Sequence, residues 1–249
     1  MFTRTIKTLI TAVLWMATTG VQAGTPVSTE VFNKLRSTLE VPSTGLKVGS
    51  VSTSELPGLY EVQFINGPLV YSTAKGDFFL VGDIFSVGPG GYVNLAEKRR
   101  DGERVAKLAS VKTDDMIVFP ATGDTLASIS VFTDVSCFYC QKLHKEVPAL
   151  NEMGVEVRYL AYPRAGVGSE AFNQLASAWC AVDKQATLTR LKNRKSVPNN
   201  VCPENPIAAQ YLLGQQLGVR GTPAIVTASG QMIPGYRTAD ELAETLGLN

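Results

Sequence analysis

The stretch FTDVSCFYCQKLH, residues 132–144, carries two cysteines, Cys137 and Cys140, separated by two aromatic residues. The apolar run SISVFTDV that leads to Cys137 predicts a strand, and the apolar residues spaced from Leu143 to Leu150 predict a helix. We therefore expect Cys137 at the N-terminus of a helix that follows a strand. The rest of the chain continues as strand, helices, hairpin and closing helix, which is typical of an α/β layered domain.

Three kinds of site use a Cys-X-X-Cys pair, and the neighbouring residues separate them. Haem attachment requires histidine directly after the second cysteine, but this position is Gln141. A structural zinc site needs four soft ligands at knuckle spacing, whereas Cys180 and Cys202 lie far downstream. His144 stands one helical turn after Cys140, so a Cys/Cys/His cluster is conceivable, although a lone histidine on a helix is rarely a ligand. Thiol redox chemistry is favoured, with no metal and no cofactor.

Thiol redox chemistry suits the expected position of Cys137. The N–H groups and the positive end of the helix dipole stabilise a thiolate there, which lowers its pKa below the ~8.5 of a free cysteine. The thiolate is the species that attacks a disulfide. Cys140 would lie one turn further into the helix, shielded but close enough to attack Cys137 and to resolve a mixed disulfide.

A second motif, GVRGTPAIV at residues 218–226, places Thr222-Pro223 after a predicted helix and at the start of a predicted strand. A proline in this position is a candidate for a cis peptide bond. A cis proline leaves the N–H and C=O of the preceding residue pointing outward, where an extended substrate can pair with them. A trans proline at an ordinary strand start is the alternative, and without the upstream Cys-X-X-Cys pair we would prefer it.

The N-terminus has the pattern of a secretory signal peptide. Residues 1–23 begin with a basic segment containing Arg4 and Lys7, continue with the apolar run LITAVLWMA, and end with the small residues Val21 and Ala23. This run is too short to span a bilayer comfortably, so cleavage after about Ala23 is favoured over an uncleaved anchor helix. Export would place the four cysteines in an oxidising compartment, where an even number fits two disulfides.

The charge balance argues against nucleic acid as a partner. The 249 residues contain 23 basic and 22 acidic side chains, and removal of residues 1–23 would lower the basic count to 21. The short basic run at 98–100 is followed by Asp101 and Glu103, as on a solvated helix face. Because no basic cluster is interleaved with aromatic residues, no nucleic acid partner is predicted.

Two further parts are predicted before the domain that carries the cysteine pair. Residues 24–90 are typical of a helix followed by antiparallel strands, a unit with little core of its own. Gly82 interrupts the last apolar strand and makes it a candidate edge for pairing with a second chain; an internal bulge is an equal alternative. Residues 94–112 predict a helix that is polar almost all round, typical of a bridge between domains, with Gly102 as a hinge.

These motifs resemble those of the DsbC/DsbG family of periplasmic protein-disulfide isomerases. The resemblance rests on FTDVSCFYC, KLH, VEVRYLAYPR, GVRGTPAIV and PGYR, in an exported chain with its own N-terminal β domain. It implies an α/β thioredoxin fold over residues 113–249 with a helical insertion at about 164–205. It also implies a small α+β (cystatin-like) dimerisation domain at 24–90, a linker helix at 91–112, and a V-shaped homodimer whose active sites face a cleft.

The resemblance further implies roles for individual residues. Cys137 would be the attacking thiol, Cys140 the resolving thiol, and Thr222-Pro223 the cis-proline loop beside them. Cys180 and Cys202 match the family's second cysteine pair, which forms a structural disulfide. The expected substrates are misfolded disulfide-containing proteins in the periplasm. The expected electron donor is an inner-membrane thiol reductase of the DsbD type.

The dipeptide inside the cysteine pair departs from the family. The DsbC subgroup usually carries Gly-Tyr and the DsbG subgroup Pro-Tyr, whereas this chain carries Phe138-Tyr139. Since the dipeptide affects the thiolate pKa and the redox potential, both subgroups stay open.

The leading hypothesis is a disulfide isomerase or reductase; the alternatives are a holdase chaperone and a DsbG-like reductase of sulfenylated cysteines. A monomeric thiol oxidase is disfavoured because it has no use for the N-terminal β domain.

Overall fold

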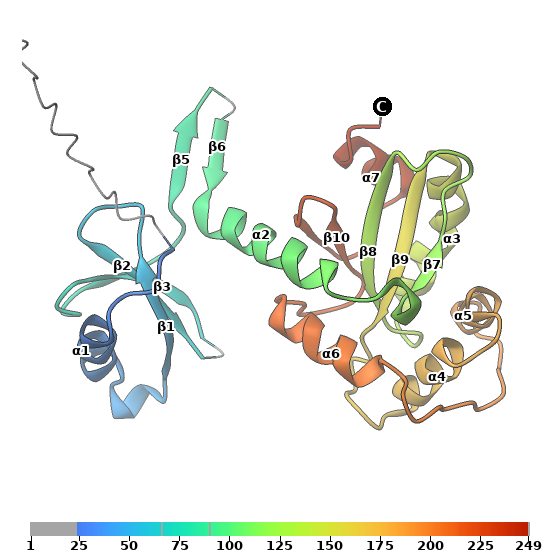
Figure 1. The fold of residues 1–249 in the computed structure, drawn as a ribbon, viewed down its shortest axis with the longest axis horizontal. Coiled ribbons are helices and arrows are strands. Elements are labelled where there is room, and N and C mark those ends of the chain that lie inside the picture. Colours follow the sequence, from blue (N-terminus) through green and yellow to red (C-terminus); the bar gives the residue numbers. More distant parts are fainter. Residues whose placement is uncertain (1–23, 66, 90, 249) are drawn as a thin grey trace, which may run out of the picture. The chain divides into compact units, whose positions relative to one another are not determined.

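The structure is a computed structural model that describes residues 24–65, 67–89 and 91–248 (Figure 1). The predicted signal peptide lies outside the described residues. None of the described helices is both long enough and apolar enough to cross a membrane. The chain divides between Asp83 and Ile84 into two compact units, and each unit has a sheet of its own.

The first unit is a helix packed on a four-stranded antiparallel sheet with the strand order β1-β2-β3-β4. Its elements are α1 (Thr29–Leu39), the 3-10 helix η1 (Pro42–Thr44), β1 (Val48–Thr53), β2 (Leu59–Phe64), β3 (Leu69–Thr73) and β4 (Phe79–Val81). Ser28 begins α1, since its hydroxyl accepts a hydrogen bond from the Val31 N–H. Leu35, Val62 and Val70 lie in one small core, as expected for a unit of this size.

β4 is an edge strand with exposed apolar side chains. Phe79, Leu80 and Val81 are 54%, 64% and 68% exposed, and among the described strands β4 pairs only with β3. The strand ends before Gly82, and the next strand, β5 (Phe85–Gly88), belongs to a different sheet. The prediction of one apolar strand interrupted at Gly82 is therefore wrong, because Gly82 lies between two strands. An exposed apolar edge is typical of a surface that pairs with another chain.

The second unit contains a five-stranded sheet with the order β11-β10-β8-β9-β7, in which β8 and β9 are parallel and the other pairs antiparallel. The predicted α/β layered domain is confirmed. Besides β5, the elements are β6 (Gly91–Asn94), α2 (Leu95–Ala109), η2 (Thr113–Asp115), β7 (Ile117–Phe119), β8 (Ala127–Thr133), α3 (Phe138–Glu152), β9 (Val155–Ala161), α4 (Glu170–Trp179), α5 (Lys184–Lys192), α6 (Ile207–Gln216), β10 (Ala224–Thr227), β11 (Met232–Pro234) and α7 (Ala239–Thr245).

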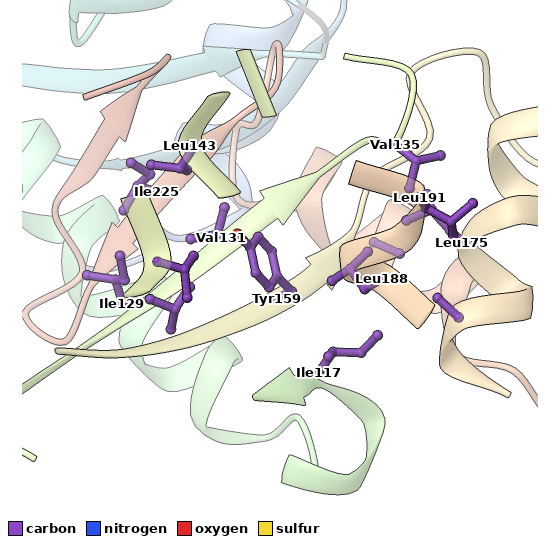
Figure 2. Packing of buried hydrophobic residues seen from close by; sticks show 14 of the residues in the cluster. Ile117, Ile129, Val131, Val135, Leu143, Tyr159, Leu175, Leu188, Leu191 and Ile225 are labelled. Carbon is purple, nitrogen blue, oxygen red and sulfur yellow. The ribbon is translucent and has the colours of Figure 1, made fainter. Parts of the chain in front are cut away.

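Both faces of this sheet are covered, so the unit has two cores. Successive residues of β8 point to opposite faces, and accordingly Val131 belongs to the larger cluster and Phe132 to the smaller one. The larger cluster also holds Leu143 of α3, Leu175 of α4 and Leu188 of α5, as Figure 2 shows. The helices between β9 and α6 are therefore anchored to the same core as the helix that carries the cysteine pair.

The polar helix α2 is docked within the second unit. Arg104 is only 5% exposed, and its guanidinium donates hydrogen bonds to the carbonyl oxygens of Leu217 and Gly230, both at 3.3 Å. A Cβ atom at Gly230 would overlap the Asp101 carbonyl group, so only glycine fits this close approach. The helix runs unbroken through Gly102. The structure does not have the expected hinge at Gly102, because residues on both sides of it contact the rest of the unit.

Candidate active site

The Cys-X-X-Cys pair lies where β8 passes into α3. Thr133 ends β8, and Cys137 is the N-cap residue of α3, with φ −79° and ψ 121°. Cys137 and Cys140 are free thiols, and they are buried, at 3% and 1% exposure. The Cys137 Sγ donates a hydrogen bond to the carbonyl oxygen of Thr222, 3.2 Å away. The expected place of Cys137 at a helix N-terminus is confirmed.

The two thiols have opposite acidities. The pKa of Cys137 falls from 9.0 to about 5, chiefly because the Cys140 side chain donates a hydrogen bond to it. Burial opposes this change, while a hydrogen bond from Thr222, the Cys140 backbone N–H and the charge of Arg164 support it. The pKa of Cys140 is raised, first by burial and then by the hydrogen bond that its thiol donates to Cys137. At neutral pH, Cys137 is a thiolate and Cys140 a thiol.

Thr222 contacts the Cys137 sulfur from the loop that precedes β10. The Thr222–Pro223 peptide bond is cis, as the sequence suggested. In the thiol form of Cys137 the Thr222 carbonyl oxygen accepts the S–H, and the buried Thr222 hydroxyl has no hydrogen-bond partner among the described residues. Ionisation of Cys137 supplies an acceptor for that hydroxyl. A buried donor that only the thiolate satisfies lowers the pKa of the thiol.

We expect Thr222→Val to raise the pKa of Cys137 by about one unit without destabilising the fold. Valine keeps the shape of threonine but removes the hydroxyl, whose hydrogen bond is the second largest cause that lowers this pKa. The pH profile of Cys137 alkylation measures the shift, and Thr222→Ser, which keeps the hydroxyl, is the control. An unchanged profile in Thr222→Val would mean that the hydroxyl does not contact the thiolate.

Asp134 shapes the loop between β8 and Cys137. Its carboxylate accepts hydrogen bonds from the Ser136 N–H and hydroxyl, both at 2.7 Å, and from the Arg164 N–H at 2.8 Å. Burial opposes ionisation, but these hydrogen bonds hold the pKa of Asp134 below its usual value. The carboxylate also pairs with the Arg164 guanidinium at 3.4 Å, which keeps that charge near Cys137. Sequence reasoning missed Asp134 and Arg164, because no local pattern links residues 30 positions apart.

The histidine that follows the cysteine pair is a core residue. His144 is buried, and its two ring nitrogens contact the hydroxyls of Tyr159 and Thr189, each at 3.0 Å. Burial, followed by the charge of Lys192, lowers the pKa of His144 to about 4, so the ring is neutral at neutral pH. With both nitrogens engaged by hydroxyls, His144 is not available to a Cys/Cys/His zinc cluster.

Two hollows of the second unit adjoin the cysteine pair. One has a volume of ≈ 390 Å³, and its lining includes Thr222 and Pro223. The other has a volume of ≈ 510 Å³, and its lining includes Phe138 and Lys192. Phe138 and Tyr139 are 60% and 56% exposed, and their rings meet edge-on with centroids 5.4 Å apart. The aromatic dipeptide thus faces solvent, where a polypeptide can contact it.

Cys180 and Cys202 form a disulfide that closes part of the segment between β9 and α6. Their Cα atoms are 5.8 Å apart, and they are separated by 22 positions in the sequence. The second cysteine pair that the resemblance implied is therefore bonded in this structure. The neighbouring Trp179 indole N–H donates to the Asp115 carbonyl oxygen at 2.7 Å, which ties this segment to the end of η2, just before β7.

The fold and the dithiol pair define the class of thioredoxin-like thiol–disulfide proteins. Residues 113–248 match the family described as thioredoxin-like domain, and residues 22–97 match the disulfide bond isomerase protein N-terminal domain. The chain belongs to the DsbC family of thiol:disulfide interchange proteins, and thiol:disulfide interchange is its activity. The fold class expected from the sequence, a thioredoxin-like domain after a DsbC-type N-terminal domain, is confirmed.

Individual relatives support this assignment. The chain is 35% identical over 202 residues to the thiol:disulfide interchange protein DsbC of Escherichia coli K12, covering 81% of this chain and 82% of that protein. It is 37% identical over 202 residues to DsbC of Dickeya dadantii, with the same coverage of 81% and 82%. Among solved structures, a disulfide interchange protein from Neisseria gonorrhoeae aligns with a TM-score of 0.50 and 28% identity, over 56% of this chain and 98% of the other.

Proposed function

We propose that this chain rearranges or reduces non-native disulfides of exported proteins, with Cys137 as the attacking thiolate and Cys140 as the resolving thiol. The observation that carries the proposal is the opposite acidity of the two thiols. Cys137 has a pKa of about 5 and contacts the Thr222 loop, whereas Cys140 is buried and its pKa is raised. A thiolate is the nucleophile that attacks a substrate disulfide. A neighbouring protonated thiol does not compete in that step, and it attacks only after the mixed disulfide has formed.

The first chemical step consumes one substrate disulfide. The Cys137 thiolate attacks one of its sulfurs, a Cys137–substrate S–S bond forms, and the second substrate sulfur leaves as a thiolate. In isomerisation, substrate thiolates attack other disulfides and finally expel the Cys137 thiolate, so no net oxidation occurs. In reduction, the Cys140 sulfur attacks Cys137 instead. The substrate then gains two electrons, and the Cys137–Cys140 pair becomes a disulfide.

The cis-proline loop and the aromatic dipeptide are our candidates for substrate contact. Thr222 and Pro223 line the hollow of ≈ 390 Å³, where an extended chain can pair with the loop backbone as an added strand. Phe138 and Tyr139 offer exposed apolar rings next to the attacking sulfur. We propose a purely structural role for the disulfide between Cys180 and Cys202.

The N-terminal domain of the family supports a homodimer, and the exposed apolar edge of β4 is our candidate for the contact. We assign dimerisation to residues 24–90, the linker role to 91–112, and catalysis to 113–249 with the insertion at about 164–205.

We also propose export to the periplasm with cleavage after about Ala23. Since each reduction leaves Cys137 and Cys140 oxidised, a DsbD-type thiol reductase is our candidate for the protein that restores the dithiol.

The test is reactivation of a scrambled multi-disulfide protein in glutathione buffer by wild type, Cys137→Ser and Cys140→Ser. We expect Cys137→Ser to lose nearly all reactivation, because a serine hydroxyl is not ionised at neutral pH. Cys140→Ser should lose net reduction and accumulate mixed disulfides. Reactivation that survives Cys137→Ser would refute the proposal and favour a holdase chaperone. Preference for sulfenylated, folded proteins over scrambled disulfides would favour the DsbG-like alternative.

A further inference from the structure

Lys192 is a buried lysine close to the cysteine pair. It is the last residue of α5 and is only 2% exposed. Lysine is almost never fully buried unless its charge is compensated, because an ammonium group removed from water loses its hydration. A lysine buried at such a cost close to reacting groups is a candidate for a functional role.

The hydrogen bonds of Lys192 place its ammonium group under the loop that leads to Cys137. Nζ donates to the Thr133 hydroxyl and, at 3.0 Å, to the Asp134 carbonyl oxygen. Thr133 is the last residue of β8, and Asp134 is the first residue of the loop. A lysine ammonium has three N–H donors. The described residues therefore accept two of the three, and one N–H remains for another acceptor.

The charged and titratable groups that face Lys192 come from three elements. The loop after β8 contributes the Asp134 carboxylate, α3 with its N-cap residue contributes Cys137, Cys140 and His144, and β9 contributes Tyr159. Burial holds the pKa of Lys192 below its ordinary value, and the charges of Cys140, Asp134 and Cys137 oppose this effect, in that order. In return, the Lys192 charge lowers the pKa of Cys140 against the larger effect of burial.

We propose that Lys192 is a positioning residue for the release step, in which its ammonium group stabilises the thiolate form of Cys140. This inference rests on the proposed roles of Cys137 and Cys140. In that step the Cys140 thiol gives its proton to solvent, and its sulfur attacks Cys137 in the mixed disulfide. The Cys137–substrate bond breaks, the Cys137–Cys140 bond forms, and the substrate sulfur leaves as a thiolate that takes up a proton from water. The substrate is thereby reduced and the pair oxidised.

Two features of the site support this role. Cys140 is 1% exposed, so its thiolate is not hydrated and depends on charges supplied by the protein. Lys192 supplies such a charge. His144 does not, because its ring is neutral at neutral pH and both ring nitrogens are engaged by hydroxyls. Lys192 also lines the hollow of ≈ 510 Å³ next to Phe138, so this buried side chain borders a cavity beside the cysteine pair.

The test is a single-turnover reaction of the reduced protein with a dye-labelled peptide disulfide, followed by stopped flow across a range of pH. We expect Lys192→Met to leave formation of the mixed disulfide unchanged, because Cys137 is already ionised at neutral pH. Loss of a nearby opposite charge raises a thiol pKa by about 1–3 units, and the more basic thiolate is a better nucleophile. Release of the labelled peptide should therefore be about 3- to 30-fold slower at pH 7, with its pH midpoint raised.

Matched variants separate this role from a structural one. Lys192→Gln keeps a hydrogen-bond donor for Thr133 and Asp134 without the charge, and it should behave like Lys192→Met. If Lys192→Met does not fold, Lys192→Gln takes its place in the test. Lys192→Arg keeps the charge and should release peptide close to the wild-type rate. Lys195→Met removes an exposed charge three residues away and should change nothing.

Two results would overturn the inference. One is an unchanged release rate and pH profile in the variants that lack the charge. The other is equal slowing in Lys192→Arg and Lys192→Met, which would indicate packing rather than charge. In both cases the mixed disulfide still forms, so the proposed function stands. Failure of the wild type to form a mixed disulfide through Cys137 would contradict the proposed function itself.

Discussion

Alkylation of Cys137 in the reduced protein is expected to titrate with a midpoint near pH 5, far below the 9.0 of an ordinary thiol. The hydrogen bond from the Cys140 side chain is the largest cause, so Cys140→Ala should move the midpoint upward by more than about one unit. The measurement is the rate of iodoacetamide addition as a function of pH, with the modified residue identified by mass spectrometry.

The control in the same experiment is Cys140. It should stay unmodified in the native protein at neutral pH, because it is buried and its pKa is raised. It should react once the protein is unfolded. A midpoint near the ordinary value for Cys137 would show that the α3 N-terminus and the Thr222 loop do not stabilise the thiolate, and the proposed attacking role would lose its main support.

The same shift has a consequence for stability. Because the pKa of Cys137 in the folded protein lies below its ordinary value, the thiolate stabilises the folded reduced state fully above about pH 9. This contribution is lost as the pH falls from about 9 toward 5. The difference in unfolding free energy between reduced wild type and Cys137→Ser should therefore shrink as the pH is lowered over that range.

Replacing both Cys180 and Cys202 by serine is expected to lower the free energy of unfolding by about 3 kcal/mol. The disulfide closes a loop of 22 positions, and loss of the crosslink raises the entropy of the unfolded chain. The insertion should not unfold by itself, because Leu175 and Leu188 are buried in the core that α3 also shares. Denaturant unfolding of the second unit measures the change.

This comparison needs a background without thiol exchange. Both proteins should carry Cys137→Ser, so that the reactive thiol cannot reshuffle the disulfide during unfolding. The double substitution is preferred to a single one, because a lone free cysteine could form new disulfides. An unchanged unfolding free energy would contradict a stabilising role for this disulfide.

The local patterns of the sequence predicted most of the elements around the site. The strand before Cys137, the helix after it and the closing helix all depend on residues within a few positions of one another. Two short elements were missed. β7 has only three residues, and α5 has a weak apolar pattern, so neither produces a clear period.

Sequence patterns also failed where charged residues are buried. The sequence predicted that α2 is polar almost all round and bridges domains, yet the Arg104 guanidinium is held by carbonyl oxygens more than 100 positions away. No sequence pattern singled out Lys192 or Asp134, and each is buried against partners from distant segments. Periodicity treats charge as a sign of exposure, and a charge can be buried only when the fold brings compensating groups to it.

The sequence by itself determined the place of the cysteine pair at a helix N-terminus and predicted its redox role, with a proline loop suited to face it. Those features depend on residue type and short spacing, which the covalent chain specifies directly. Only the tertiary structure decided which thiol ionises and what surrounds the other one. The acidity of Cys137 and the burial of Cys140 beside Lys192 depend on Thr222, Arg164 and α5, which only folding brings to the pair. Electrostatic effects fall off with distance in space, so no pattern along the chain could reveal them.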